Sequence, residues 1–118
     1  AAPRKPAFSQ ERIMNETQFI EATEALMDRI EDVLEATDLD VDVDRSGNVM
    51  TIAFDNGEEV VINRHGPTQQ MWLASRHGGL HFALEDGKWR CTRTGADFWD
   101  ALNDTVSLVA GEKVELSA

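Results

Sequence analysis

A chain of 118 residues, 42% of them hydrophobic, is long enough for one domain with a compact core, and no apolar run approaches the roughly 20 residues of a membrane span. The net charge of −11 lies almost wholly in residues 15–44, which contain eleven acidic residues and one basic residue. Such an acidic segment repels phosphates, so it excludes nucleic acid as its partner and favours cations or basic proteins. A single cysteine, Cys91, excludes an internal disulfide and is compatible with a reducing compartment.

The first thirteen residues, AAPRKPAFSQERI, contain two prolines and three basic residues and show no periodicity. We expect residues 1–13 to be a flexible or vector-derived extension and residues 14–118 to form a single domain. The alternative is that the extension is the remnant of a basic targeting peptide.

Residues 16–36 have the periodicity of an amphipathic helix, with Asn15 as its cap and Gln18 completing a capping box. Its apolar stripe consists of Phe19, Ala22, Leu26, Ile30 and Val33. The opposite, acidic stripe consists of Glu21, Glu24, Asp28, Glu31 and Glu35. We therefore expect one side of the helix to face a core and the other to face water.

Six strand-like runs follow, separated by residues typical of turns. The runs are 39–44, 49–54, 58–63, 69–74, 80–84 and 88–92, with a break at Pro67. The expected turns are 45–48, a type I′ turn at 55–57, a bend at 78–79 and a turn at 85–87.

A second helix is predicted over 95–110, capped by Thr94 and ended by Gly111. Its expected buried stripe is Phe98, Leu102, Thr105 and Val109. The order helix, six strands, helix predicts an α+β two-layer sandwich, with both helices on one face of an antiparallel sheet.

The segment DLDVDVD, residues 38–44, alternates acidic and apolar residues, as a half-buried strand does. Carboxylates are hard oxygen ligands suited to iron, manganese, calcium and magnesium. Same-face carboxylates on a strand are roughly 7 Å apart, too far for all of them to reach one ion. We expect weak, multiple and exchangeable cation binding; the alternatives are a merely solvated face or a face that meets a basic protein.

Met71 and Trp72 are adjacent, so on a strand they face opposite sides of the sheet. A tryptophan on the open face would indicate partner binding, and the alternative is a small satellite core. A metal site formed by His77, His81 and Cys91 is not expected, because Gly78 and Gly79 separate the histidines and a buried structural thiol is the ordinary role of such a cysteine.

Three segments carry a resemblance to a known family: TIAFDNGEEVVIN, NRHGPTQQMWLASRHGGLHF and DGKWRCTRTGADFWDAL. Together with the acidic helix and strand, they resemble the bacterial, CyaY-type frataxins from Met14 to about Ser117. The resemblance implies the same α+β sandwich and a role in iron–sulfur cluster biogenesis, with iron bound weakly on an acidic ridge. One residue departs from the family, which usually has glutamine where this chain has His65.

The resemblance also implies that the protein docks on a cysteine desulfurase and on its iron–sulfur scaffold protein, and it supplies the site residues. The expected metal ligands, which we call the acidic ridge, are Glu21, Glu24, Asp28, Glu31, Asp32, Asp38, Asp40, Asp42 and Asp44. The expected partner-binding residues are Trp72, Asn63, Gln70 and Glu35. The expected cargo is weakly bound iron, Fe²⁺ or Fe³⁺, with other divalent cations as alternatives.

We thus expect an iron-binding regulator or iron donor that is mainly non-enzymatic and acts by binding the desulfurase–scaffold complex. A weak ferroxidase or iron store that oligomerises with metal is one alternative, and an acidic docking adaptor without a metal role is another. We expect a monomer in the bacterial cytoplasm, with the mitochondrial matrix as the alternative compartment and neither membrane nor nucleic acid as a partner.

Overall fold

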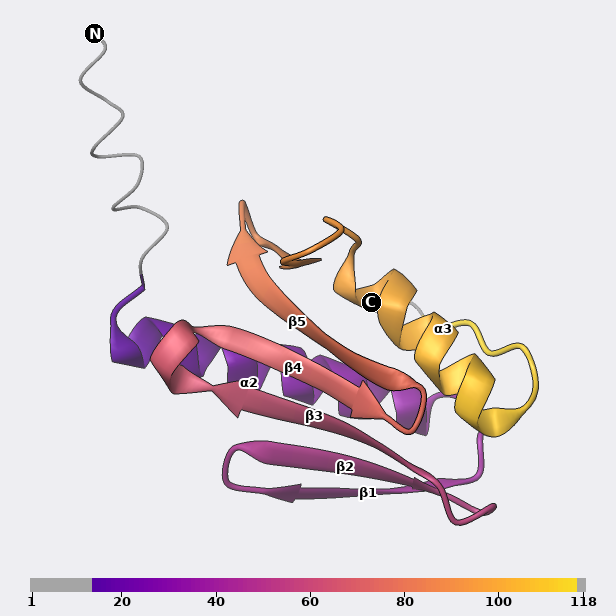
Figure 1. The fold of residues 1–118 in the computed structure, drawn as a ribbon. Helices are drawn as coiled ribbons and strands as arrows, with labels where there is room; N and C mark the ends of the chain where they lie inside the picture. The colour runs from indigo at the N-terminus through magenta and orange to yellow at the C-terminus, as the bar shows by residue number, and fades with distance from the viewer. Residues whose placement is uncertain (1–13, 117–118) are drawn as a thin grey trace, which may run out of the picture.

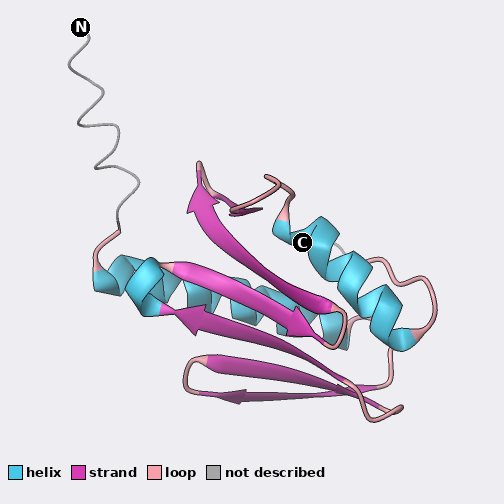
Figure 2. Cartoon of the chain, viewed as in Figure 1, coloured by secondary structure: helices cyan, strands magenta, loops and turns pink. Residues whose placement is uncertain are grey.

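The computed structural model describes residues 14–116, and the expected extension at 1–13 lies outside them. The elements are α2 (Glu16–Glu35), β1 (Val41–Ser46), β2 (Val49–Phe54), β3 (Glu59–His65), the 3-10 turn η1 (Gly66–Thr68), β4 (Gln70–Ser75), β5 (Gly78–Glu85), β6 (Lys88–Cys91) and α3 (Phe98–Ala110). The strands form one antiparallel sheet in the order β1-β2-β3-β4-β5-β6 (Figures 1 and 2). The predicted two-layer α+β sandwich is confirmed.

Both helices lie on the same face of this sheet, and β3 and β4 pass in front of α2 in Figure 1. The core lies between the layers and includes Met50, Ile52, Ile62, Met71 and Phe82 from the strands and Met27, Ile30, Phe98, Leu102 and Val106 from the helices. Phe82 and Phe98 meet edge to face at a centroid distance of 5.1 Å, so an aromatic pair joins α3 to the sheet. The other face of the sheet, which we call the open face, carries no helix from the described residues 14–116.

The first helix begins as its sequence predicts. The Gln18 backbone N–H donates to Asn15 Oδ1 at 2.7 Å, and the Asn15 backbone N–H donates to Gln18 Oε1 at 3.0 Å. This capping box satisfies two polar groups at the helix end. The apolar stripe is also confirmed, except that Ala22 is only half-buried and Thr23 beside it is fully buried.

Two hairpin turns differ from the prediction, one in its form and one in its position. The loop 55–57 is not a type I′ turn, because only Gly57 has a positive φ, of 89°, while the Asn56 side chain donates to the Val109 carbonyl. The bend predicted at 78–79 is wrong: the turn is at 76–77, and Gly78 pairs with Ser75 in the ladder. A hydrogen bond from the His77 N–H to Ser75 Oγ supports this tighter turn.

The first strand is shifted by two residues relative to the prediction. It runs over Val41–Ser46 because the turn needs only Gly47, with φ 59°, and Asn48. Arg45 and Ser46 therefore belong to the strand and pair with Met50 and Val49. The alternation of exposed and half-buried side chains continues to the end of the strand.

The second helix starts three residues later than predicted. Gly95 has a φ of 79° and closes a tight turn, in which its N–H donates to the Cys91 carbonyl. Residues 95–97 therefore lie before the helix and not in it. Asp97 is the cap, and its carboxylate accepts from the Trp99 N–H at 3.0 Å. Gly111 ends the helix with φ 74°, as expected, whereas Thr105 is half-buried and Val106 takes its place in the core.

Replacing the cap, Asp97→Ala, should lower the free energy of unfolding by about 1 kcal/mol, because the first turn of α3 loses its side-chain acceptor. Urea denaturation followed by circular dichroism measures the change. Asp104→Ala is the matched control, since Asp104 is exposed inside the same helix and alanine is a better helix former. An equal loss in the two variants would contradict the capping role.

No helix among residues 14–116 combines the length and apolar character that crossing a membrane requires.

Candidate functional site

The strand aspartates, Asp38, Asp40, Asp42 and Asp44, lie along one edge of the sheet. All four are exposed and alternate with the half-buried Leu39, Val41 and Val43. They belong to β1 and the segment that leads into it, and β1 is an edge strand with β2 as its sheet partner. Aspartates on an edge strand also hinder pairing with another chain, so this edge favours cations and basic surfaces over sheet extension.

The geometry of the strand aspartates does not form a preformed metal cage. Residues 14–116 contain no group of three or more His, Cys, Asp or Glu side chains placed to hold one ion. Within the same described range, none of the four aspartates forms an ion pair. A hard cation at this edge would take one or two carboxylates and keep much of its water.

The helical part of the acidic ridge is organised differently. Arg45 reaches from β1 to α2, and its guanidinium contacts three carboxylates from successive turns. The distances are 2.7 Å to Glu24, 2.6 Å to Asp28 and 2.8 Å to Glu31. The hydrogen bonds that Arg45 donates to Asp28 and Glu31 raise the pKa of Arg45 above its ordinary value, so the guanidinium is always charged.

A second arginine supports the same cluster from β3. Arg64 Nη1 donates to Glu24 Oε2 and to Thr23 Oγ1, each at 2.9 Å, and its side chain is only 10% exposed. Three of the expected metal ligands, Glu24, Asp28 and Glu31, are thus already paired with arginines, while Glu21, Asp32 and Glu35 on the same helix are exposed. Iron binding by the helical members of the acidic ridge stays a prediction for all five: Glu21, Glu24, Asp28, Glu31 and Asp32.

Sequence reasoning missed the Arg45 contacts because it placed Arg45 in a turn. The signal was present: Arg45 continues the series Leu39, Val41, Val43 at every second position, which is the side of β1 that faces the helices. The spacing of Glu24, Asp28 and Glu31 by four and three residues places them on one face of α2. Together these two periodicities bring one cation against three carboxylates.

Replacing Arg45 by glutamine should lower the free energy of unfolding by about 1–2 kcal/mol, since three ion pairs are lost and three carboxylates then repel one another. Urea denaturation at low salt measures the loss, which should shrink in high salt because the repulsion is screened. Arg76→Gln is the control, because Arg76 is 69% exposed and makes a single ion pair with Glu58 at 3.2 Å. Equal effects of the two changes would refute a special role for Arg45.

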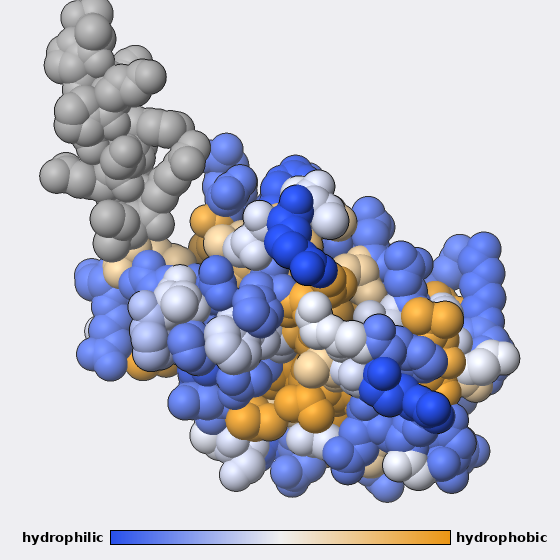
Figure 3. Space-filling view, in the orientation of Figure 1, coloured by the Kyte–Doolittle hydropathy of each residue, from blue (hydrophilic) through white to orange (hydrophobic). Residues whose placement is uncertain are grey.

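The expected partner-binding residues divide between two places. Asn63, Gln70 and Trp72 lie on the open face, where Trp72 pairs with Asn63 across the ladder and Met71 points into the core. Glu35 is exposed at the end of α2 and belongs to the acidic side of the molecule. The view in Figure 3 shows hydrophilic residues surrounding a band of hydrophobic ones on the side turned away from α2.

Two histidines that the prediction left out flank Trp72. The rings of His65 and Trp72 stack at 4.1 Å, and those of Trp72 and His81 stack at 4.2 Å. We call these three residues the ring stack; they come from β3, β4 and β5. At His65, the position that departs from the family, the imidazole covers one face of the indole.

The arrangement separates His81 from Cys91. His81 is on the open face, whereas Cys91 is buried on the helix side, opposite Phe82 in the ladder. A hydrogen bond from the Thr94 side chain, assisted by the backbone N–H groups of Arg93 and Thr94, lowers the pKa of the Cys91 thiol, although burial acts in the opposite direction. Cys91 is a buried residue of the core, as expected.

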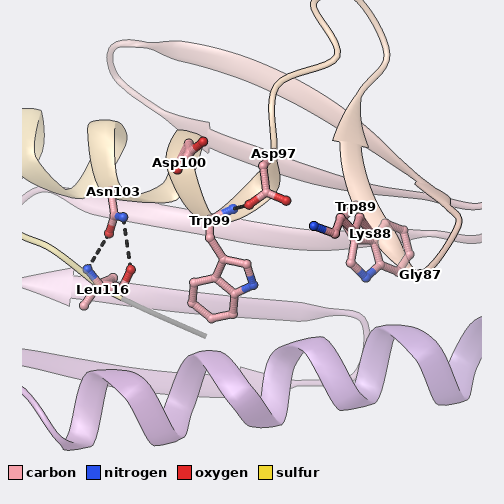
Figure 4. A pocket seen from close by; sticks show the side chains of 8 residues that line it. All are labelled: Gly87, Lys88, Trp89, Asp97, Trp99, Asp100, Asn103 and Leu116. Atoms are coloured by element: carbon pink, nitrogen blue, oxygen red, sulfur yellow. Dashed lines mark hydrogen bonds between the residues drawn. The ribbon is translucent and has the colours of Figure 1, made fainter.

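A hollow of about 460 Å³ lies beside the start of α3 (Figure 4). Its polar side chains are largely used by the fold, because Asp97 caps α3 and Asn103 exchanges two hydrogen bonds with the backbone of Leu116. The Trp99 ring extends into it. With no paired nucleophile and base in its lining, this hollow is not the candidate site.

The fold and these surfaces define a class of protein: a two-layer α+β domain with an acidic sheet edge and an aromatic cluster on its open face. The model of the frataxin-like domain matches residues 12–112. The chain belongs to the frataxin-like family.

Individual relatives agree with this assignment. The chain is 45% identical over 105 residues to the iron-sulfur cluster assembly protein CyaY of Neisseria meningitidis, covering 89% of this chain and 98% of the relative. It is 39% identical to the protein of that name in Paraburkholderia phymatum, covering 88% and 99%. Among solved structures, the frataxin of Psychromonas ingrahamii superimposes with a TM-score of 0.82 at 33% identity, covering 89% and 100%.

A eukaryotic structure is also similar. A trimeric frataxin of the yeast Saccharomyces cerevisiae, complexed with ferrous iron, superimposes with a TM-score of 0.62 at 31% identity, covering 85% of this chain and 89% of the yeast chain. The resemblance inferred from the sequence is therefore confirmed at the level of family and fold.

Proposed function

We propose that this protein carries weakly bound iron in iron–sulfur cluster assembly and regulates that process by binding the cysteine desulfurase–scaffold complex. The observation that carries the proposal is the row of exposed strand aspartates on a sheet edge, in a chain whose relatives include proteins named for iron–sulfur cluster assembly. Iron is a cargo here, not a resident cofactor.

The donor chemistry fits such a cargo. Exposed carboxylates are hard ligands that accept Fe²⁺ or Fe³⁺, and they hold other divalent cations in the same way. Because the strand aspartates are spread along a strand, each ion gains few protein ligands and leaves easily. Ready release suits delivery to an assembly complex better than long-term storage.

The same edge fits a basic protein surface. The four strand aspartates, together with the exposed Glu21, Asp32 and Glu35, form a field of one sign that speeds encounter with a basic partner. We assign this side to the desulfurase. The open face, with Asn63, Gln70 and the ring stack, is assigned to the scaffold protein, because a half-buried tryptophan on the open face of a sheet is typical of a protein interface.

Arg45 divides the acidic ridge in this proposal. Glu24, Asp28 and Glu31 are engaged with Arg45 and contribute mainly to tying β1 to α2. The strand aspartates and the remaining exposed carboxylates of α2 are the first to meet iron and partner. Iron should therefore affect the strand side of the ridge at lower concentration than the Arg45 side.

The test is an anaerobic ¹H–¹⁵N NMR titration with Fe²⁺, followed by addition of the desulfurase. We expect paramagnetic loss of signals confined to residues 21–44, beginning at 38–44, and then desulfurase-induced shifts over the same residues. Shifts with the desulfurase but none with iron would leave an acidic docking adaptor and remove the iron claim. Steady oxidation of ferrous iron with metal-dependent oligomers would instead favour the ferroxidase or storage alternative.

A further inference from the structure

The indole of Trp72 is enclosed on both of its faces. His65 stacks on one face at 4.1 Å with 15° between the planes, and His81 stacks on the other at 4.2 Å with 11°. His81 is directly opposite Trp72 in the β4–β5 ladder, and His65 lies diagonally, opposite Gln70 in the β3–β4 ladder. The three rings therefore form one parallel stack across three strands.

The polar atom of the indole is also engaged. Trp72 Nε1 donates to Gln70 Oε1 at 2.9 Å, two residues back on the same strand and the same side of the sheet. His65 is itself held, because its Nδ1 lies 2.8 Å from Thr68 Oγ1 in the turn that follows β3. Neither the faces nor the N–H of Trp72 remain for a ligand while these contacts persist.

We infer that Trp72 is presented edge-on to its partner, with His65, His81 and Gln70 as positioning residues that fix the ring. This inference rests on the proposed docking of the open face. What a partner meets is the rim of an aromatic ring, which is apolar and carries the positive end of the ring quadrupole. The matching surface is an apolar socket bordered by carbonyl or carboxylate oxygens.

Edge-on presentation excludes two common modes of tryptophan recognition. A cationic side chain binds the face of an indole, and a planar side chain stacks on that face, but here both positions are taken by imidazoles. A ring that is already fixed loses little freedom on binding, so the clamp contributes to affinity by preorganisation. The scaffold surface should therefore receive the rim of the indole and not its face.

The experiment compares two double variants with the natural chain. His65→Ala with His81→Ala removes both flanking rings, and His65→Phe with His81→Phe restores flat rings without imidazole nitrogens. The first readout needs no partner: the heteronuclear NOE of the Trp72 indole N–H, identified among the three tryptophan signals by its loss in Trp72→Phe. The second readout is the Kd for the scaffold protein.

We expect the alanine pair to lower the indole NOE and to raise the Kd about 10-fold, with the phenylalanine pair close to the natural chain in both. Equal or tighter binding by the alanine pair would overturn the inference, because it would mean that the partner stacks on an uncovered face. An unchanged NOE would also overturn it. If the natural chain does not bind the scaffold, the proposed docking fails, and the NOE alone still decides whether the histidines position Trp72.

Single variants guard against a loss of structure. His65→Ala and His81→Ala each remove one ring from a surface position, and the backbone amide spectrum reports whether the sheet is intact. Each should lower the indole NOE by less than the pair does. A full effect from one histidine with none from the other would refute a two-sided clamp.

Discussion

Changing Asp38, Asp40 and Asp42 together to lysine should raise the Kd for the cysteine desulfurase about 100-fold, by replacing three attractive charges with three repulsive ones. The same variant should lose most of the iron-induced broadening over residues 38–44. Both effects follow because these carboxylates are exposed and form no ion pair with residues 14–116. Titration calorimetry measures the first, and the anaerobic NMR titration measures the second.

The matched control changes Glu85, Asp104 and Glu115 to lysine. All three residues are exposed, and the change in formal charge is the same. They lie on β5, on α3 and after α3, away from the β1 edge. A comparable rise in Kd for the control would mean that net charge alone drives binding and that the β1 edge is not the docking surface. A loss of desulfurase binding with iron broadening intact would place metal and partner on different carboxylates.

The elements of this fold could be predicted because their signals are local. A period of two gives each strand two distinct sides, and a capping box defines the start of α2 within one turn. The errors in the bounds of the elements lie at turns. Whether Thr94 or Asp97 caps α3 depends on the tight turn between Cys91 and Gly95. That turn is closed by a backbone hydrogen bond, which composition does not reveal.

The candidate site was predictable in its residue types but not in its contacts. The acidic residues of the ridge could be named from the sequence and the resemblance, yet the pairing of Arg45 with α2 depends on how the helix crosses the sheet. The same is true of the ring stack, because His65 and His81 are brought to Trp72 by the register of three strands. Local periodicity can place Arg45 and the three carboxylates on facing sides of β1 and α2, but which side chains meet follows from the tertiary geometry.

The two proposed surfaces are carried by the same sheet but differ in physical character. The β1 edge acts through charge, so salt should weaken it and it should mainly affect the rate of encounter. The ring stack acts through shape and apolar contact, so it should mainly affect the lifetime of the complex.

Truncating Trp72 to alanine should raise the Kd for the scaffold protein at least 30-fold, which corresponds to about 2 kcal/mol. The effect should lie in the dissociation rate, because a buried aromatic anchor is lost while the charges that steer encounter remain. The free energy of unfolding should fall by about 1–3 kcal/mol, since the side chain lies outside the core but its two ring stacks with His65 and His81 are lost. Surface plasmon resonance against immobilised scaffold measures both rates.

Leu108→Ala is the control for Trp72→Ala, because Leu108 is 60% exposed and lies on α3, on the opposite side of the sheet. It should leave both rate constants unchanged. If Trp72→Ala slows association and leaves dissociation unchanged, the open face contributes to steering and not to the anchored complex. If Leu108→Ala weakens scaffold binding as much as Trp72→Ala does, the scaffold meets the helical layer, and the assignment of the open face is wrong.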